Sequence, residues 1–252
     1  MTSSVKTLLE IVQDILSDMD GDEVNSISDT AESEQVASIV EKTYQNMMSN
    51  SVWPHTRRAT ALTPYSDSTK PTHMYLNDDV KELISVYYNV IKQGETRKSY
   101  QKIDYLEPDR FLQKINVRNN TKTNVDIITD PSGIELMILN DTAPKYYTSF
   151  DDVTLVFDAY DSEVDSTLQE SKFQALGYIM PSFRKEDSFT PDLPPDAFSY
   201  LVEEATSRAQ MKLREVQDVK SETESIKQGR WLSRKSWRTN GGIRFPNYGK
   251  TK

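Results

Sequence analysis

Residues 198–216 read Phe198-Ser-Tyr-Leu-Val-Glu-Glu-Ala-Thr-Ser-Arg-Ala-Gln-Met-Lys-Leu-Arg-Glu-Val216 and are typical of an amphipathic helix. Pro195 suits the first turn of such a helix, and Gly229 suits the position just past its end. A helix that continues to Gln228 has about 33 residues and is about 50 Å long, against an average of about 11–12 residues. We therefore expect its apolar stripe to pack on other helices of the chain or on neighbouring copies. The stripe consists of Phe198, Val202, Ala205, Ala209, Leu213 and Val216.

Two further amphipathic helices are expected near the N-terminus. The first spans residues 5–19, and the second spans residues 29–53. Asp29 can cap the free N–H groups of the second helix, with Glu32 three residues later bonding back to the cap. Trp53-Pro54 ends it, because Pro disfavours a helical residue before it. The two stripes pack together most simply as a helical hairpin over residues 1–54, on which the helix of residues 191–228 then packs.

Residues 55–190 have the pattern of β-structure. Asp130-Pro-Ser-Gly133 has the signature of a type I turn, which predicts a hairpin of its flanking strands, and residues 108–115 predict a short helix. The fold class is expected to be α+β, with the N-terminal hairpin and the long C-terminal helix forming a helical bundle. An antiparallel β meander is inserted in it, and residues 229–252 form an extended tail. Strands are predicted at 57–63, 83–91, 99–105, 125–128, 134–138, 154–160 and 173–179.

The composition excludes several classes of function. The chain has no cysteine and two histidines, which excludes disulfides, thiolate metal sites, cysteine nucleophiles and His-rich metal sites. No run of apolar residues approaches the length of about 18 residues that is needed to span a bilayer. The N-terminus also lacks the pattern of a signal peptide. We therefore expect a soluble protein that is made in the cytoplasm and has no membrane partner.

No catalytic motif occurs in the sequence. There is no Gly-rich loop for a phosphate and no Ser between glycines, and we interpret His55 and His73 as surface or packed histidines. Acidic residues at alternate positions from Asp161 resemble the start of a calcium loop, but the Gly and the twelfth-position Glu of such a loop are missing. We expect no enzyme activity, no cofactor and no metal. The acidic residues are interpreted as a solvated or channel-facing loop: Asp151, Asp152, Asp158, Asp161, Glu163 and Asp165.

The end of the chain differs in charge from the rest. The net charge is −9, yet no acidic residue follows Glu224 and eight basic residues do. Aromatic residues are interleaved with them, from Trp231 to Tyr248. The combination indicates a protein groove, because Trp, Tyr and Arg dominate interface energetics, or nucleic acid, through stacking and phosphate contacts. Because an acidic body repels phosphates, we favour the protein groove and keep nucleic-acid binding as the alternative.

The order of these elements resembles a family of viral proteins. Its sharpest motifs are the turn Trp53-Pro54-His55 and the terminal Asn247-Tyr-Gly249 within Gly241-Gly-Ile-Arg-Phe-Pro-Asn-Tyr-Gly249. Between them, Pro191-Asp-Leu-Pro-Pro-Asp-Ala-Phe198 precedes a long helix that contains Leu201-Val-Glu-Glu-Ala205. Over nearly the whole chain this resembles the bacteriophage head-to-tail adaptors, or connectors, of the tail tubular protein A type in short-tailed phages.

The resemblance implies a structural virion protein at the head–tail junction, assembled in the host cytoplasm. Twelve copies would form a ring between the portal protein and the tail nozzle, a tail tubular protein B-like protein, and the tail fibres would be further partners. Packaged DNA would pass through the ring during ejection without specific binding. The six stripe residues from Phe198 to Val216 would pack between copies. The β segment of residues 65–190 is larger than in shorter adaptors, which leaves the nozzle and fibre contacts open. The implied portal-binding residues are Trp231, Arg234, Trp237, Arg238, Arg244, Phe245 and Tyr248.

Overall fold

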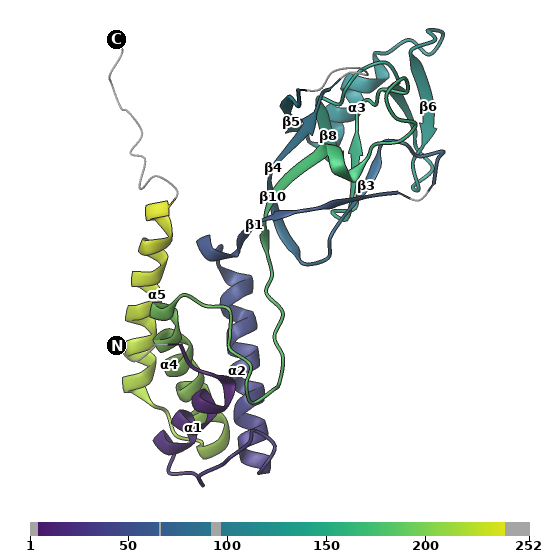
Figure 1. Cartoon of the computed structure of the whole chain (residues 1–252). Coiled ribbons are helices and arrows are strands. Elements are labelled where there is room, and N and C mark those ends of the chain that lie inside the picture. The colour runs from purple at the N-terminus through teal and green to yellow at the C-terminus, as the bar shows by residue number, and fades with distance from the viewer. Residues whose placement is uncertain (1–4, 66, 92–96, 240–252) are drawn as a thin grey trace, which may run out of the picture. The chain divides into compact units, whose positions relative to one another are not determined.

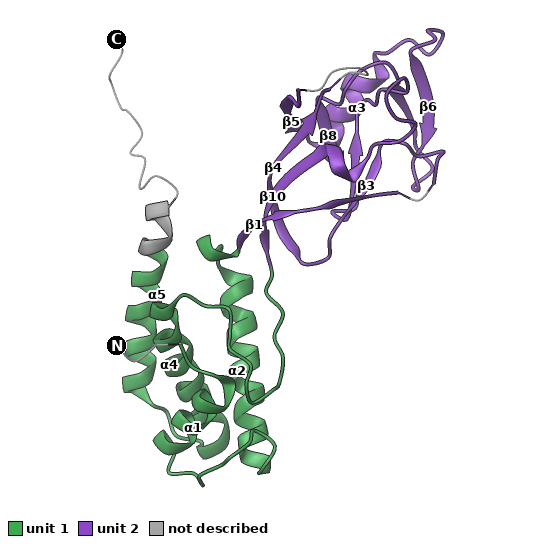
Figure 2. Ribbon diagram, in the orientation of Figure 1, with its two compact units in different colours: residues 1–56, 180–252 green, residues 57–179 purple. Residues whose placement is uncertain are grey.

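A computed structural model shows two compact units (Figures 1 and 2). It describes residues 5–65, 67–91 and 97–239, with side chains up to residue 233. Unit 1 consists of Met1–Thr56 and Met180–Lys252, and unit 2 consists of Arg57–Ile179. In sequence, unit 2 is therefore inserted between the two segments that make up unit 1.

Unit 1 is built from helices at both ends of the chain. Thr7 caps the first helix in a capping box with Glu10. The second helix begins at a box of Thr30 and Ser33, one residue later than the expected cap Asp29. The elements are α1 (Leu8–Asp18), α2 (Ala31–Asn50), α4 (Phe198–Ala209) and α5 (Val219–Thr239), with the 3-10 turns η1 (Pro54–Thr56) and η3 (Pro195–Ala197) and the π-helical turn η4 (Gln210–Arg214).

The core of unit 1 lies where α1, α2 and α4 pack on one another. Ala205 and Ala209 present small side chains, which let the backbone of α4 approach the two N-terminal helices closely. The two ends of the chain thus share one core. Its fully or almost fully buried side chains include Leu8, Ile11, Val12, Ile15, Val36, Val40, Tyr44, Phe198 and Leu201.

The expected long C-terminal helix is wrong, because the chain reverses after α4. Glu215, which follows η4, has a φ of 57° and lies in the left-handed region. α5 then runs back beside α4 (Figure 1), and residues 198–239 form what we call the α4–α5 hairpin. No Gly or Pro interrupts residues 198–228, so the apolar stripe alone predicted one continuous helix.

The start and the end of α5 also differ from the expected helix end at Gln228. The Asp218 carboxylate accepts hydrogen bonds from the backbone N–H and the hydroxyl of Ser221, and this cap starts a new helix. α5 continues through Gly229 to Thr239, so the first part of the expected extended tail is helical. The spacing of Asp218 and Ser221 is a capping signal that the sequence analysis missed.

Gly229 lies inside α5 because the helix crosses an aromatic ring there. A Cβ at this position would lie 3.3 Å from Cε2 of Tyr200 in α4, which is closer than ordinary contact. The absence of a side chain therefore allows α5 to pack on α4. This close approach, and not a helix end, accounts for the glycine.

Unit 2 is dominated by a mixed, eight-stranded sheet that is nearly closed like a barrel. The strand order is β1-β10-β4-β5-β8-β9-β3-β2, and β5 and β8 are its parallel pair. β6 and β7 form a separate two-stranded sheet. The strands are β1 (Arg57–Thr60), β2 (Leu62–Pro64), β3 (His73–Leu76), β4 (Val80–Asn89), β5 (Tyr100–Tyr105), β6 (Val125–Thr129), β7 (Glu135–Leu139), β8 (Tyr146–Ser149), β9 (Thr154–Phe157) and β10 (Phe173–Ile179).

The expected β meander is therefore also wrong, and with it the fold class of a helical bundle with an inserted meander. A meander places consecutive strands side by side, whereas β10 lies between β1 and β4, and β8 lies beside β5. The strands β3 and β8, of four residues each, were not among the predicted ones. The hairpin around residues 130–133 is confirmed as β6 and β7, and the short helix is confirmed as α3 (Pro108–Asn116).

One bent segment brings the two edges of the large sheet together. Residues 57–60 pair with β10, and after Ala61 residues 62–64 pair with β3. The same stretch of chain thus serves as the first and the last strand of the sheet, which leaves little exposed edge. α3, β6 and β7 contribute buried side chains to the core beneath it, among them Phe111, Ile115 and Ile138.

We predict that Gly229→Val destabilises unit 1 by about 1–3 kcal/mol, because the new side chain overpacks against Tyr200. All three Trp residues of the chain belong to unit 1, so denaturant unfolding followed by Trp fluorescence reports on this unit. Thr223→Val, on the exposed side of the same helix, is the matched control. Wild-type stability of Gly229→Val would show that Tyr200 does not limit the approach of α5.

Candidate interaction surface on the α4–α5 hairpin

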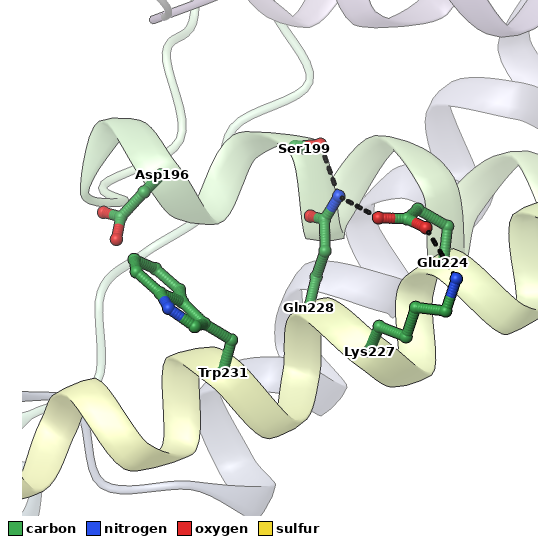
Figure 3. Close-up of a pocket in the computed structure, with 6 residues that line it drawn as sticks. All are labelled: Asp196, Ser199, Glu224, Lys227, Gln228 and Trp231. Atoms are coloured by element: carbon green, nitrogen blue, oxygen red, sulfur yellow. Dashed lines mark hydrogen bonds and ion pairs between the residues drawn. The ribbon is translucent and has the colours of Figure 1, made fainter.

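An open groove of about 440 Å³ lies between the start of α4 and the middle of α5 (Figure 3). α5 places Trp231 at one end of it, with 54% of this residue exposed. The Gln228 amide crosses the groove and donates a hydrogen bond of 2.9 Å to Ser199 Oγ. We call this feature the Trp231 groove. It is lined by Asp196, Ser199, Glu224, Lys227, Gln228 and Trp231.

Polar contacts also hold α4 and α5 together next to the groove. The Ser225 hydroxyl donates a hydrogen bond to the Glu204 carboxylate, which also pairs with Arg208 at 2.8 Å. Burial, and then the Glu204 charge, raises the pKa of Tyr200. The bond between Ser225 and Glu204 and the close approach of Gly229 to Tyr200 thus join α5 to α4 beside the groove.

A second exposed surface lies on the side of α5 that faces away from α4. Ser221, Ser225 and Leu232 are buried and mark the inner side of the helix. The opposite side carries Val219 and Ile226, which are 62% and 48% exposed and lie seven positions apart on one face. Among the described elements, α4 is the main packing partner of α5. We define the outer face of α5 as Val219, Thr223, Ile226 and Arg230, all of them exposed.

The predicted ring-packing residues are not equally accessible. Phe198, Ala205 and Ala209 are buried in the core of unit 1, so packing within one chain already covers this part of the stripe. Val202 and Leu213 are half-buried at the edge of that core. The last residue, Val216, is 57% exposed at the tip of the hairpin. The sequence could not distinguish the buried end of the stripe from its exposed end, because no residue pattern marks the break of the helix at residue 215.

The predicted portal-binding residues are described only in part. Trp231 lies in the groove described above. Arg234, Trp237 and Arg238 belong to the last turns of α5, beyond the described side chains. The predictions for Arg244, Phe245 and Tyr248 lie outside the described residues.

Asp158, one of the acidic residues interpreted as a solvated loop, is buried. It is 3% exposed, and its Oδ2 pairs with Arg118 at 2.8 Å. Its Oδ1 accepts hydrogen bonds of 2.9 Å from the backbone N–H groups of Lys145 and Tyr146. The interpretation of Asp158 as solvated or channel-facing is therefore wrong, because this carboxylate links β8 and β9 to the end of α3.

The other acidic residues of that set have separate roles. The Asp151 carboxylate accepts hydrogen bonds from the backbone N–H and the hydroxyl of Thr154 and so shapes the turn before β9. Asp165 pairs with Lys172, and the Asp161 carboxylate accepts a hydrogen bond from the backbone N–H of Glu163. Within the described parts of the chain, no three His, Cys, Asp or Glu residues are placed to hold a metal ion.

His73 forms a buried polar cluster in unit 2. It is 1% exposed, its Nε2 lies 3.1 Å from Asp130 Oδ1, and its Nδ1 lies 3.5 Å from the Thr72 hydroxyl. These residue types occur in nucleophile–base–acid relays, but Thr72 is fully buried, so a substrate has no access to its hydroxyl. The contact instead attaches the β6–β7 turn to β3.

Burial lowers the pKa of His73, and the hydrogen bond and charge of Asp130 only partly oppose it. Burial alone raises the pKa of Asp130, but hydrogen bonds from Ser132 and His73 outweigh it and lower the pKa overall. The other histidine, His55, belongs to unit 1, and its Nε2 lies 2.9 Å from the carbonyl oxygen of Asp192. Neither histidine is therefore placed as an accessible base.

No helix in the described parts of the chain is both long enough and apolar enough to cross a bilayer.

We predict that unit 2 loses stability as the pH falls through 6.5. The folded pKa of His73 lies below its ordinary value of 6.5, so in this window the unfolded chain binds a proton more readily than the folded chain. The contribution of neutral His73 to stability is thus fully present above pH 6.5, and it decreases until the pH reaches the folded pKa of His73. Hydrogen exchange of the β3 amides, followed against pH in wild type and in His73→Gln, measures the stability of unit 2. The dependence of this stability on pH should disappear in the variant. His55→Gln is the control; a slope that follows His55 instead contradicts the assignment.

No protein-family model matches the chain, and no curated protein sequence matches it either.

Proposed function

We propose that this chain is a non-enzymatic structural subunit of a virion, a head-to-tail adaptor of a short-tailed phage. In this proposal, copies form a ring of twelve between the portal protein and the tail nozzle, assembled in the host cytoplasm. The ring continues the DNA channel at the head–tail junction, and tail fibres are further partners.

One observation carries the proposal: two motifs of the adaptor resemblance, far apart in sequence, meet in unit 1. His55 contacts the Asp192 carbonyl at 2.9 Å, and the Tyr44 hydroxyl contacts the same carbonyl at 3.4 Å. Trp53 is 8% exposed, and its Nε1 donates a hydrogen bond to the Met47 carbonyl. The Trp-Pro-His turn and the Pro-rich segment before α4 thus serve one structural purpose. The resemblance therefore rests on residues that act together.

The surface chemistry of the α4–α5 hairpin supports a protein partner. Trp231 is more than half exposed beside Asp196 and Glu224, and aromatic residues with a polar rim are typical of interface anchors. Met211, at 66% exposed, and Val216 add apolar area at the tip of the hairpin. Burying such side chains against a partner is favourable by about 25 cal/mol per Å² of apolar surface.

The charge of the chain supports passage of DNA without binding. The net charge is −9, and a ring of such chains repels phosphates at long range. Nucleic-acid binding by the basic C-terminal residues is the alternative function, supported by the eight basic residues after Glu224.

We predict that Trp231→Ala weakens binding to the portal ring encoded in the same genome by about 2 kcal/mol or more. Truncation after Ser233 keeps the buried Leu232 and should abolish binding. Co-sedimentation with purified portal rings measures both effects. Tyr105→Ala, a 49% exposed aromatic residue of unit 2, is the matched control and should bind as wild type does.

Full portal affinity of the truncated chain would place the anchor elsewhere. If the chain instead binds DNA, with an affinity that falls steeply with added salt and is lost on truncation, the nucleic-acid function replaces the adaptor function.

A further inference from the structure

Unit 1 carries two exposed surfaces of opposite charge. Between Lys6 and Lys42 the sequence has ten acidic residues and no basic one. From Ser225 to the C-terminus it has eight basic residues and no acidic one. Both segments belong to unit 1, so this unit has an acidic segment from α1 into α2 and a basic segment in the second half of α5.

The acidic surface includes a groove of about 780 Å³ between the end of α1 and the segment that follows it. Leu16 and Val24 line it and are almost completely buried, whereas the exposed acidic residues Asp20, Asp22 and Glu23 line its rim. We call this the acidic groove. The accessible part of the acidic groove is therefore mainly polar and negative, above a floor of buried Leu16 and Val24.

Ion pairs within the chain neutralise only part of this surface. Among the described residues, three of the ten carboxylates form ion pairs: Asp14 with Lys6, Glu32 with Arg214, and Glu41 with Lys185. Burial, and then the charges of Asp14 and Asp218, raises the pKa of Asp18, as expected for crowded negative charge. A positively charged partner would relieve this repulsion.

The outer face of α5 has the complementary character. Val219 and Ile226 supply exposed apolar side chains, and Arg230 lies on the same face, with the exposed Lys227 beside it. Val219 and Ile226 thus form an apolar strip on a side of α5 that none of the described elements covers. The positive charge of Arg230 and Lys227 therefore complements the negative rim of the acidic groove.

We propose that the outer face of α5 in one copy docks into the acidic groove of a second copy. This inference rests on the proposed function and deepens it by naming the surfaces through which copies meet. Since one chain carries both surfaces, a second copy is the partner that always supplies the complement. The contact is head-to-tail, so each pair of copies keeps one free surface of each kind, and such contacts generate rings when the rotation closes.

Paired charge reversals test the contact in the full-length chain. Variant A is Asp20→Lys, Asp22→Lys and Glu23→Lys, and variant B is Lys227→Glu and Arg230→Glu. Each variant alone opposes like charges, so we expect self-association to weaken about tenfold or more. When the two variants are mixed, the positive α5 of variant A meets the negative groove of variant B. The negative α5 of variant B likewise meets the positive groove of variant A. Assembly should therefore return to the wild-type mass in sedimentation velocity.

Salt dependence and apolar variants separate the two contributions. Wild-type assemblies should dissociate between about 0.1 M and about 1 M salt, where the Debye length falls from about 10 Å to about 3 Å. Val219→Ser with Ile226→Ser should weaken association without changing its salt dependence. Lys102→Glu with Lys122→Glu, exposed in unit 2, gives the same change in charge as variant B and should assemble normally. Circular dichroism checks that every variant is folded.

Three results overturn the proposal. If variant A assembles as wild type does while variant B does not, α5 contacts a surface other than the acidic groove. If A and B are folded and their mixture stays monomeric, the surfaces do not meet, and an occupant from the same chain, such as residues 240–252, becomes the explanation for the groove. A wild-type chain that is monomeric at low salt also overturns the proposal. Portal binding, measured separately, would still stand or fall on its own.

Discussion

The fold depends on one topological constraint: the chain passes from unit 1 to unit 2 and back through two neighbouring strands. It enters unit 2 at Arg57 and leaves at Ile179, and Arg57 pairs with Tyr178 in the antiparallel β1–β10 ladder. The first and last strands of the inserted unit must therefore lie side by side. This order excludes a meander, in which the first and last strands lie at opposite edges. Once β1 is beside β10, its continuation as β2 can reach β3 and nearly close the sheet.

Buried polar contacts give unit 2 a single arrangement. Arg118 and Asp158 pair with side-chain exposures of 13% and 5%, and the guanidinium also donates to the carbonyls of Met137 and Asp158. A buried ion pair of this kind adds little net stability, but removing one partner leaves a costly unpaired charge. Together with His73 and Asp130, it ties α3 and the small sheet to the large one. These residues therefore have a structural role. An active site is not supported here, because the polar groups of these residues are buried from solvent.

The α4–α5 hairpin changes what the C-terminal region can do. A single helix of residues 191–228 would place Trp231 in an extended segment, with its contacts made only on docking. In the hairpin, Trp231 instead sits on a helix fixed by Tyr200, Glu204 and Ser225, so a partner meets an ordered surface. Preorganisation of this kind lowers the entropic cost of binding. The same reversal of the chain also creates an outer face of α5 that none of the described elements covers, which is the physical basis for proposing contact between copies.

The sequence by itself determined the elements whose signals are local. The stripes of α1, α2 and α4 follow a helical period, α3 starts with a proline, and the β6–β7 hairpin follows from Asp130-Pro-Ser-Gly133. The difference in charge between the acidic N-terminal segment and the basic C-terminal segment was likewise visible in the sequence. Tertiary structure alone decided the break at Glu215, the order of the strands, and the burial of His73 and Asp158. In each case the deciding energy comes from partners distant in sequence, such as Tyr200 against Gly229 or β8 beside β5, and a local pattern cannot record a contact that only folding creates.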